Sequence, residues 1–245
     1  FSAARRKFLY PKLQNVPKVL TVSAFQTVIQ YIFFYLGLAY TTGVKGTVTS
    51  GSGAFFAVLI ASLIFKQEKL TAKKILACII GFAGIVVINF NGLSLTSEIT
   101  DLLGVGAVLL STVSNSFSSV LIKSFSKDEA PVTISGYQFI IGGIFMIIVG
   151  LLFGGKINLA DTYGVMVLVY LALLSAVAYS LWGILLKYNP VSRVTVFNFT
   201  TPIFGTLLTV LLLPTENSAI APVNLVVTLA LVSGGIFLLN YNPKK

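Results

Sequence analysis

The chain has 245 residues, of which 56% are hydrophobic and 10% charged, with a formal net charge of +10 and a mean hydropathy of +0.94. A water-soluble domain of this composition would expose a very large apolar surface, so we expect an all-α, polytopic membrane protein surrounded by a lipid bilayer. The chain has no histidine, a single cysteine and no basic run suited to nucleic acid, so we expect no metal, no cofactor and no nucleic-acid partner.

Apolar segments of about 20 residues, the length that crosses a bilayer core, follow one another along the chain. Before the first of them, Arg5, Arg6 and Lys7 precede Pro11 and Pro17, a pattern typical of a loop between helices and not of a signal peptide. Proline, glycine, asparagine and charged residues fill the connections. In chain order, the eight predicted spans are residues 21–40, 47–65, 75–90, 102–122, 132–153, 163–186, 194–213 and 223–239.

The basic residues are distributed unevenly over the predicted connections. If the chain begins in the cytoplasm and the spans alternate in direction, 15 of the 17 lysines and arginines lie on the cytoplasmic side and only Lys45 and Lys156 lie outside. Membrane proteins concentrate positive charge in cytoplasmic loops, so this distribution accounts for the net charge. It predicts a multi-pass protein of the plasma membrane with both termini in the cytoplasm.

A diverged internal repeat relates residues 31–68 to residues 179–216 at a constant offset of 148. Chance matches are frequent between apolar helices, but these matches include polar and charged residues in register, which favours a duplication. The clearest pairs are Tyr31 with Tyr179, Lys45 with Arg193, Thr47 with Thr195, Phe56 with Phe204 and Glu68 with Glu216.

The repeat divides the chain unequally, with three spans in residues 1–92 and five in residues 93–245. Matching spans enter the membrane from opposite sides, so the repeats are inverted, as an odd number of spans in each repeat requires. We expect the intact protein to have ten helices, two of which precede Phe1 and are absent from this chain; a natural eight-span protein is the alternative.

Residues 170–187 (YLALLSAVAYSLWGILLK), followed by Pro202 and Glu216, resemble the second repeat of the EamA branch of the drug/metabolite transporter superfamily. The segments LIFKQEKL at 63–70 and GFAG at 81–84 resemble the end of its first repeat. The resemblance implies ten helices in two inverted repeats of five, and export or exchange of a small metabolite, with amino acids and amphipathic compounds as the usual range. The chain departs from the family where many members have a proline and this chain has Gly51-Ser52-Gly53.

A solute site inside a bilayer requires polar groups and interrupted helices, because the rest of the backbone there must be paired internally. The glycine-interrupted segment 49–53 corresponds through the repeat to residues 197–201, which precede Pro202. Weak points at corresponding positions of inverted repeats indicate a central site. The alternative for each residue is close helix packing or a bond to its own backbone. The four residues that we expect near the substrate are Ser50, Ser52, Asn198 and Thr201.

Other spans supply further candidates for substrate contact. Gln30 and Tyr31 lie away from the membrane edge of the first span, and Asn115 lies on a polar stripe of the fourth. Tyr179 and Trp182 offer stacking surface and hydrogen bonds. Helix packing, interhelical hydrogen bonds or, for Trp182, anchoring at the interface explain these residues as readily.

Charged residues are absent from the middle of every predicted span, which counts against a sugar-phosphate or nucleotide-sugar carrier. We therefore predict a secondary transporter that exports or exchanges a small neutral or zwitterionic metabolite by alternating access and has no catalytic residues. A structural membrane protein assembled through the glycine pairs 142–143 and 234–235 is one alternative, and an intramembrane enzyme is another, although it lacks a base. The oligomeric state is left open, with a homodimer as one option.

Overall fold

A computed structural model describes residues 10–89, 95–156, 162–199, 201–202, 204–205, 208, 211 and 222–240. Within these ranges the chain is helical and contains no strand, which confirms the all-α prediction. In the described part of the chain, five helical segments are long and apolar enough to cross a membrane: Leu13–Tyr40, Gly43–Ile64, Ile99–Phe125, Pro131–Leu152 and Thr162–Tyr188. They match five of the eight predicted spans.

The remaining three predicted spans are described to different extents. Helices α6 (Ala72–Asn89) and α12 (Pro222–Asn240) coincide with the spans predicted at 75–90 and 223–239. The span predicted at 194–213 begins with the short helix α10 (Val191–Thr195) and the 3₁₀ turn η4 (Val196–Phe199). Most of its later residues lie outside the described part of the chain, so its full length is untested.

The chain divides into two compact units, which we describe separately. The first unit contains residues 1–28 and 121–189, and the second contains residues 29–120 and 190–245. This division does not follow the predicted boundary of the repeats at residue 92, and that boundary stays a prediction.

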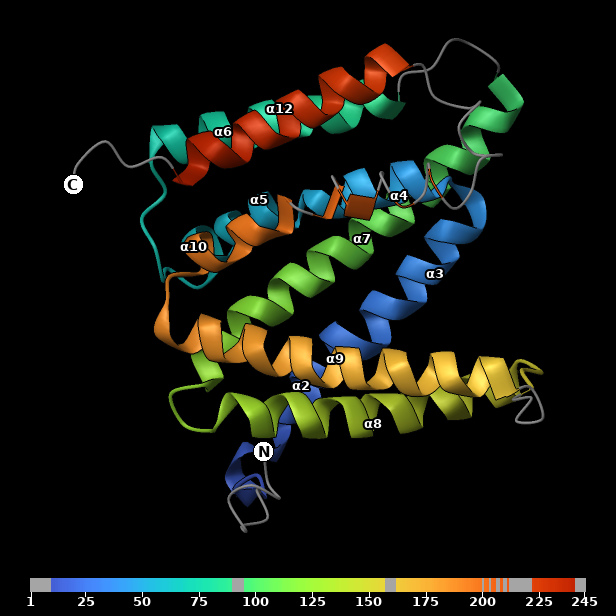
Figure 1. The fold of residues 1–245 in the computed structure, drawn as a ribbon. Helices are drawn as coiled ribbons and strands as arrows, with labels where there is room; N and C mark the ends of the chain where they lie inside the picture. Colours follow the sequence, from blue (N-terminus) through green and yellow to red (C-terminus); the bar gives the residue numbers. More distant parts are fainter. Residues whose placement is uncertain are drawn as a thin grey trace. The chain divides into compact units, whose positions relative to one another are not determined.

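The first unit is built on α8 (Pro131–Leu152), which packs against α9 (Thr162–Tyr188) and against α2 (Val16–Ser23), as Figure 1 shows. Pro17 and Pro131 each occupy the first turn of their helices, where a missing N–H leaves no helical hydrogen bond unmade. The 3₁₀ turn η1 (Leu13–Asn15) precedes α2, and the π-helical segment η2 (Ala24–Ile29) follows it.

Close approach of α2 and the following η2 to α8 depends on Gly142. A Cβ at this position would lie 2.5 Å from Thr27 Cβ and 2.8 Å from Ser23 Oγ. Ser23 Oγ donates to the carbonyl of Gln138 at 2.8 Å, so the two helices are also joined by a hydrogen bond. The packing role expected for the glycine pair is therefore carried by Gly142, whereas Gly143 has open space where its Cβ would be.

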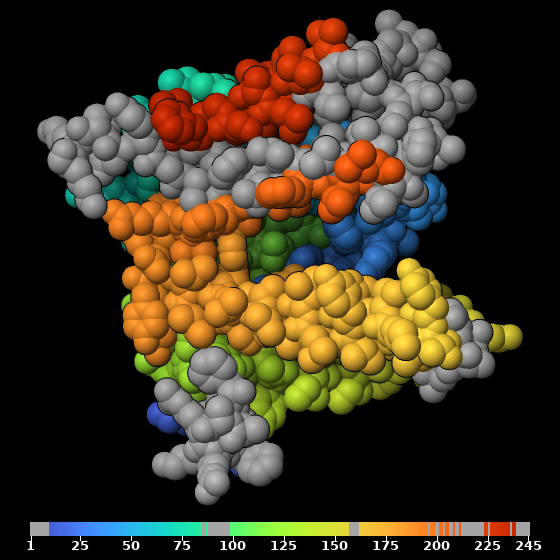
Figure 2. Space-filling view, in the orientation of Figure 1, coloured from blue at the N-terminus to red at the C-terminus, as the bar shows by residue number. Residues whose placement is uncertain are grey.

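Helix α9 exposes apolar side chains along its length, and in Figure 2 it forms a continuous yellow-to-orange surface. Leu168, Tyr170 and Leu173 are 59%, 63% and 64% exposed. A surface of this size would be unstable in water, and lipid is the environment that suits it.

The second unit contains α3 (Gln30–Tyr40), α4 (Gly43–Gly51), α5 (Gly53–Leu59), the π-helical η3 (Ile60–Ile64), α6, most of α7 (Leu95–Phe125), α10, η4 and α12. Helices α6 and α12 lie side by side in Figure 1. Glycines permit this contact: a Cβ at Gly84 would lie 2.8 Å from Val232 Cγ2, and one at Gly235 would lie 2.7 Å from the Ala77 carbonyl oxygen.

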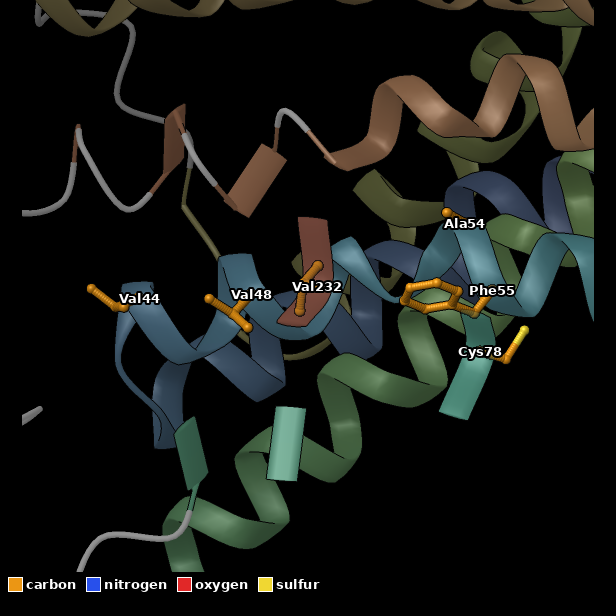
Figure 3. Close-up of a cluster of buried hydrophobic side chains, with 6 residues drawn as sticks. All are labelled: Val44, Val48, Ala54, Phe55, Cys78 and Val232. Carbon is orange, nitrogen blue, oxygen red and sulfur yellow. The ribbon is translucent and has the colours of Figure 1, made fainter. Parts of the chain in front are cut away.

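Four helices of the second unit bury a hydrophobic cluster. Phe55 is fully buried, and its ring occupies the space beside Gly81, where a Cβ would lie only 1.9 Å from Phe55 Cζ. The cluster fixes α4 and α5 against α6 and α12, and it therefore positions the junction between α4 and α5. Its members, drawn in Figure 3, are Val44, Val48, Ala54, Phe55, Cys78 and Val232.

Candidate functional site

The second predicted span is interrupted at Ser52, where α4 ends and α5 begins. Ser52 N–H donates to the carbonyl of Thr49 at 3.1 Å, which tightens the chain into a turn of three residues. Gly51 and Gly53 flank the turn, and glycine weakens a helix interior. The interruption predicted from the glycine spacing is therefore present, within a span that is otherwise continuous from Gly43 to Ile64.

The segment around Pro202 lies directly against this interruption. A Cβ on Gly51 would lie 3.0 Å from Pro202 Cγ, and one on Gly53 would lie 3.4 Å from Asn198 Nδ2. One turn before the interruption, Thr47 Cγ2 would lie 2.5 Å from a Cβ on Gly205. The three contacts run in opposite directions along the two segments, so the segments cross antiparallel.

The contacts are also nearly symmetric about Ser52. By the offset of 148 residues, Gly205, Pro202 and Asn198 correspond to Ala57, Ala54 and Ser50. Thr47, Gly51 and Gly53 contact these residues in reverse order, so each contact joins two positions at similar distances on opposite sides of Ser52.

Helix α7 supplies a third side to the crossing. Ser116 Oγ donates to the carbonyl oxygen of Gly53 at 3.0 Å, and Thr112 Cγ2 lies 3.3 Å from the position of a Cβ on Gly53. Both residues are buried and lie one helical turn apart. Sequence reasoning chose the stripe that contains Asn115, and it missed these two. Their spacing of four residues was a visible signal, but nothing in the sequence set it apart from the neighbouring stripe.

The hydroxyl groups at the interruption differ in how they are paired. Ser50 Oγ donates to the Gly46 carbonyl at 2.9 Å, and Ser52 Oγ donates to the Thr49 carbonyl at 2.6 Å. Both serines therefore bond back to their own helix, which was the alternative considered for them. Thr49 Oγ1 is buried and has no hydrogen-bond partner. At the crossing, the Thr49 hydroxyl therefore has no hydrogen-bond partner, whereas the hydroxyls of Ser50 and Ser52 bond to carbonyls of their own helix.

The other candidates in the second unit are arranged as follows. Gln30 Oε1 is buried without a hydrogen-bond partner. The ring of Tyr31 stacks on Tyr35 with centroids 6.0 Å apart. The Asn115 carbonyl accepts a hydrogen bond from Ser118 Oγ at 2.8 Å, and Thr201 is exposed.

Tyr179 and Trp182 belong to the first unit, on α9. The ring of Tyr179 packs edge-on against Phe139 with centroids 4.8 Å apart, and its carbonyl accepts a hydrogen bond from Ser135 Oγ at 3.2 Å. Trp182 is exposed. These contacts show Tyr179 packing α9 onto α8, and they leave its role in substrate binding as a prediction.

Charged groups of the second unit lie near helix ends. The Lys45 ammonium pairs with the Asp101 carboxylate, whose Oδ1 also accepts a hydrogen bond from Thr41 Oγ1 at 2.5 Å. In the connection after η3, the Glu68 carboxylate accepts hydrogen bonds from Lys74 Nζ at 2.9 Å and from Ser192 N at 3.1 Å. Burial raises the pKa of Glu68, but the hydrogen bonds from Lys74 and Ser192 outweigh burial and hold that pKa below its ordinary value.

Comparison with known proteins identifies the family. The sequence model of the EamA-like transporter family matches residues 2–90 and 102–241, which is nearly the whole chain. The chain belongs to the EamA-like transporter family. The resemblance noted in the sequence is thereby confirmed, and the protein is a membrane transporter of a family that contains transporters and not enzymes.

Curated EamA relatives give no substrate. An uncharacterized transporter of Archaeoglobus fulgidus is 29% identical over 202 residues, covering 80% of this chain and 68% of that protein. An uncharacterized transporter of Bacillus subtilis, YyaM, is 26% identical over 129 residues, covering 52% of this chain and 42% of that protein. A WAT1-related chloroplastic protein of Arabidopsis thaliana is 24% identical over 217 residues, covering 85% of this chain and 51% of that protein. The chain thus spans about half the length of the last two relatives.

A solved crystal structure has the same fold. It is similar to this EamA chain with a TM-score of 0.68, covering 97% of this chain and 81% of the other, at 18% sequence identity.

Proposed function

We propose that this EamA transporter exports or exchanges a small neutral or zwitterionic metabolite by alternating access, and that the solute contacts the crossing of the α4–α5 junction with η4 and Pro202. The candidate contacts there are Ser50, Ser52, Asn198 and Thr201, to which we add Thr49 and Ser116. Gln30, Tyr31, Asn115, Tyr179 and Trp182 remain proposed contacts.

The observation that carries the proposal is the antiparallel meeting of the two interrupted segments, with Gly51 against Pro202 and Gly53 against Asn198. Two helices that cross at weak points can rock about the crossing, and broken backbone presents polar groups to a solute inside a membrane. The symmetric contacts also support two inverted repeats. The polar side chains at the crossing are amides and hydroxyls, which suit an uncharged or zwitterionic solute better than an anion.

Solute flux into proteoliposomes tests the proposal, with neutral amino acids and amphipathic amines offered with and without a pH gradient. We expect saturable flux of one solute class, reduced about tenfold by Asn198→Ala because one hydrogen bond to the solute is lost. Asn189→Ala is the matched control, since its amide donates to the Leu185 carbonyl at the end of α9. Unchanged flux in Asn198→Ala, with only the protein yield reduced, would assign Asn198 to packing.

We also propose that both termini lie in the cytoplasm of the plasma membrane. The described ion pairs support the alternation of the spans: each of Lys18–Asp128, Lys45–Asp101 and Lys74–Glu68 joins residues that the topology assigns to one side. The excess of basic residues on the proposed cytoplasmic side supports the orientation itself. Labelling of Lys69→Cys and Lys156→Cys in a Cys78→Ser background tests it. We expect an impermeant reagent to label only Lys156→Cys in intact cells, and the reverse pattern would overturn the orientation.

A further inference from the structure

A basic pocket lies in the first unit where three helices start or end. Helix α2 begins at Val16, α7 ends at Phe125 and α8 begins at Pro131. These helices belong to membrane-length apolar segments, so their ends mark the membrane interface of this unit. The pocket is lined by Lys12, Gln14, Asn15, Lys18, Lys127 and Asp128.

Three of these six residues are lysines and one is an aspartate, which leaves the pocket with a net positive charge. The Lys18 ammonium pairs with Asp128 and lies 5.7 Å from the centre of the Phe125 ring. In the part of the chain that the structure describes, no salt bridge involves Lys12 or Lys127. Two lysines therefore remain available to neutralise a bound anion.

The neighbouring glutamate accepts its described hydrogen bonds from backbone and amide groups and not from a lysine ammonium. Glu129 Oε2 accepts hydrogen bonds from the Lys12 backbone N–H at 3.0 Å and from Asn15 Nδ2 at 3.2 Å. Its Oε1 accepts from Ala130 N at 3.3 Å, just before α8. Glu129 thus ties the loop before α2 to the start of α8 and shapes the pocket. The positive end of the α2 dipole adds to the attraction for an anion.

Apolar side chains beside the pocket favour a lipid over a soluble anion. Leu13, next to the pocket residues Lys12 and Gln14, is 88% exposed, and Leu20 on α2 is 46% exposed. Lysines at helix ends extend toward lipid headgroups while apolar neighbours contact acyl chains. A soluble phosphate would use the lysines and leave Leu13 in water.

We propose that this pocket binds the phosphate headgroup of an anionic glycerophospholipid, with Lys12, Lys18 and Lys127 around the phosphate and Leu13 against an acyl chain. None of the pocket residues is among the proposed substrate contacts. A bound lipid would stabilise the start of α2 against α8, because its headgroup would join residues of both connections.

Native mass spectrometry of the purified protein tests the proposal, with phosphatidylglycerol and phosphatidylcholine added separately at equal concentrations. We expect the wild type to retain phosphatidylglycerol in preference to phosphatidylcholine. The double variant Lys12→Gln/Lys127→Gln should lose affinity for phosphatidylglycerol by roughly tenfold to thirtyfold, since a lysine near an anionic membrane surface contributes about fivefold. Lys69→Gln/Lys156→Gln removes the same charge outside the pocket and should leave retention unchanged.

A third variant guards against simple loss of folding. The hydrogen bond from Lys18 lowers the pKa of Asp128, so this carboxylate is ionised at neutral pH and competes with a bound phosphate. Asp128→Asn should therefore increase retention of phosphatidylglycerol severalfold. Equal retention of the two lipids, or equal losses in the pocket and control double variants, would overturn the proposal. Stabilisation by inorganic phosphate alone, equal to that by phosphatidylglycerol, would overturn the lipid assignment in favour of a soluble anion.

Discussion

Gln138 on α8 is fully buried, and only one end of its amide is paired. Its Oε1 accepts a hydrogen bond from Thr27 Oγ1 at 2.9 Å, whereas its Nε2 has no partner, and both polar atoms of buried Gln26 are also unpaired. Buried polar atoms without partners destabilise a fold, since they lose their bonds to water. The first unit therefore contains an incompletely satisfied polar contact between η2 and α8.

Replacing the two members of this contact should have unequal effects. Thr27→Val leaves the whole amide of Gln138 unpaired, and we expect a loss of about 1–2 kcal/mol in the free energy of unfolding. Gln138→Met removes an amide nitrogen that is already unpaired, and the Thr27 hydroxyl can turn to its own helix backbone, so the loss should be smaller. Thermal unfolding of both variants in detergent gives the comparison. A larger loss in Gln138→Met would mean that its Nε2 has a partner in solution.

Glu68 should make stability depend on pH. Its pKa is lowered in the folded protein despite burial, through hydrogen bonds from Lys74 and Ser192. A carboxylate with a lowered folded pKa stabilises the fold above its unfolded pKa, and this contribution disappears as the pH falls through the folded pKa. We expect Glu68→Gln to unfold at a lower temperature than wild type at neutral pH, with the difference vanishing in acid. Unfolding temperatures measured over that range check this, and a difference that stays constant with pH would contradict it.

Some of these residues could be predicted from the sequence, and others could not. The repeat singled out Gly51, Asn198 and Pro202, because a duplicated weak point is visible in one chain. Thr112 and Ser116 were not predicted, because α7 has many small polar residues that form several equivalent stripes. Only the packing of the helices decides which stripe faces the crossing. Ser50 and Ser52 were chosen for their hydroxyls, but the sequence cannot show that those hydroxyls bond back to their own helix.

At the scale of elements, the segment GFAG at 81–84 has a clear packing role. Gly81 makes room for the ring of Phe55 from α5, and Gly84 makes room for Val232 from α12. Thr228 Oγ1 on α12 adds a hydrogen bond to the Gly84 carbonyl at 3.1 Å. One short segment of α6 therefore fits two neighbours on two sides, which explains why small residues are needed there.

Gly81→Ala should disrupt this packing more than alanine at an open glycine. The added methyl group would overlap the Phe55 ring, and overpacking of this kind typically costs about 1–3 kcal/mol. Gly136→Ala is the matched control, since no atom lies within 4 Å of its Cβ position. We expect a lower yield and unfolding temperature for Gly81→Ala alone, measured by size-exclusion chromatography and thermal unfolding. Equal behaviour of the two variants would show that Phe55 adapts without cost.

The positions of the helices could be predicted where a long apolar run marks a membrane span, but the irregular turns within the helices could not. Residues 132–153 and 163–186 were predicted within a few residues of α8 and α9, because long apolar runs leave little alternative in a membrane. The π-helical segments η2 and η3 lie inside predicted spans without a sequence signal. A π-helical turn forms when a backbone N–H bonds to the carbonyl five residues earlier instead of four. In η3, Phe65 N donates in this way to the Ile60 carbonyl at 3.1 Å.

At the scale of the whole molecule, the predicted duplication would explain why the two interrupted segments meet. Two copies of one element in opposite orientations place their weak points at the same depth of the membrane. A common crossing point then follows from symmetry and needs no further sequence signal. The charge distribution is also a property of the whole molecule, because it predicts the direction of all the spans together.

Disulfide trapping can test the antiparallel crossing directly. Thr47 and Gly205 are close enough that their Cβ positions would be 2.8 Å apart, so Thr47→Cys/Gly205→Cys in a Cys78→Ser background should crosslink readily under mild oxidation. Thr47→Cys/Asn198→Cys is the control, because Asn198 lies against Gly53 and not against Thr47. Six residues separate Thr47 from Gly53, a rise of about 9 Å along a helix, which is too far for a disulfide. A parallel crossing would favour the control pair instead. Crosslinking of Thr47→Cys/Gly205→Cys that disappears when substrate is added would further indicate that the crossing moves during transport, as alternating access requires.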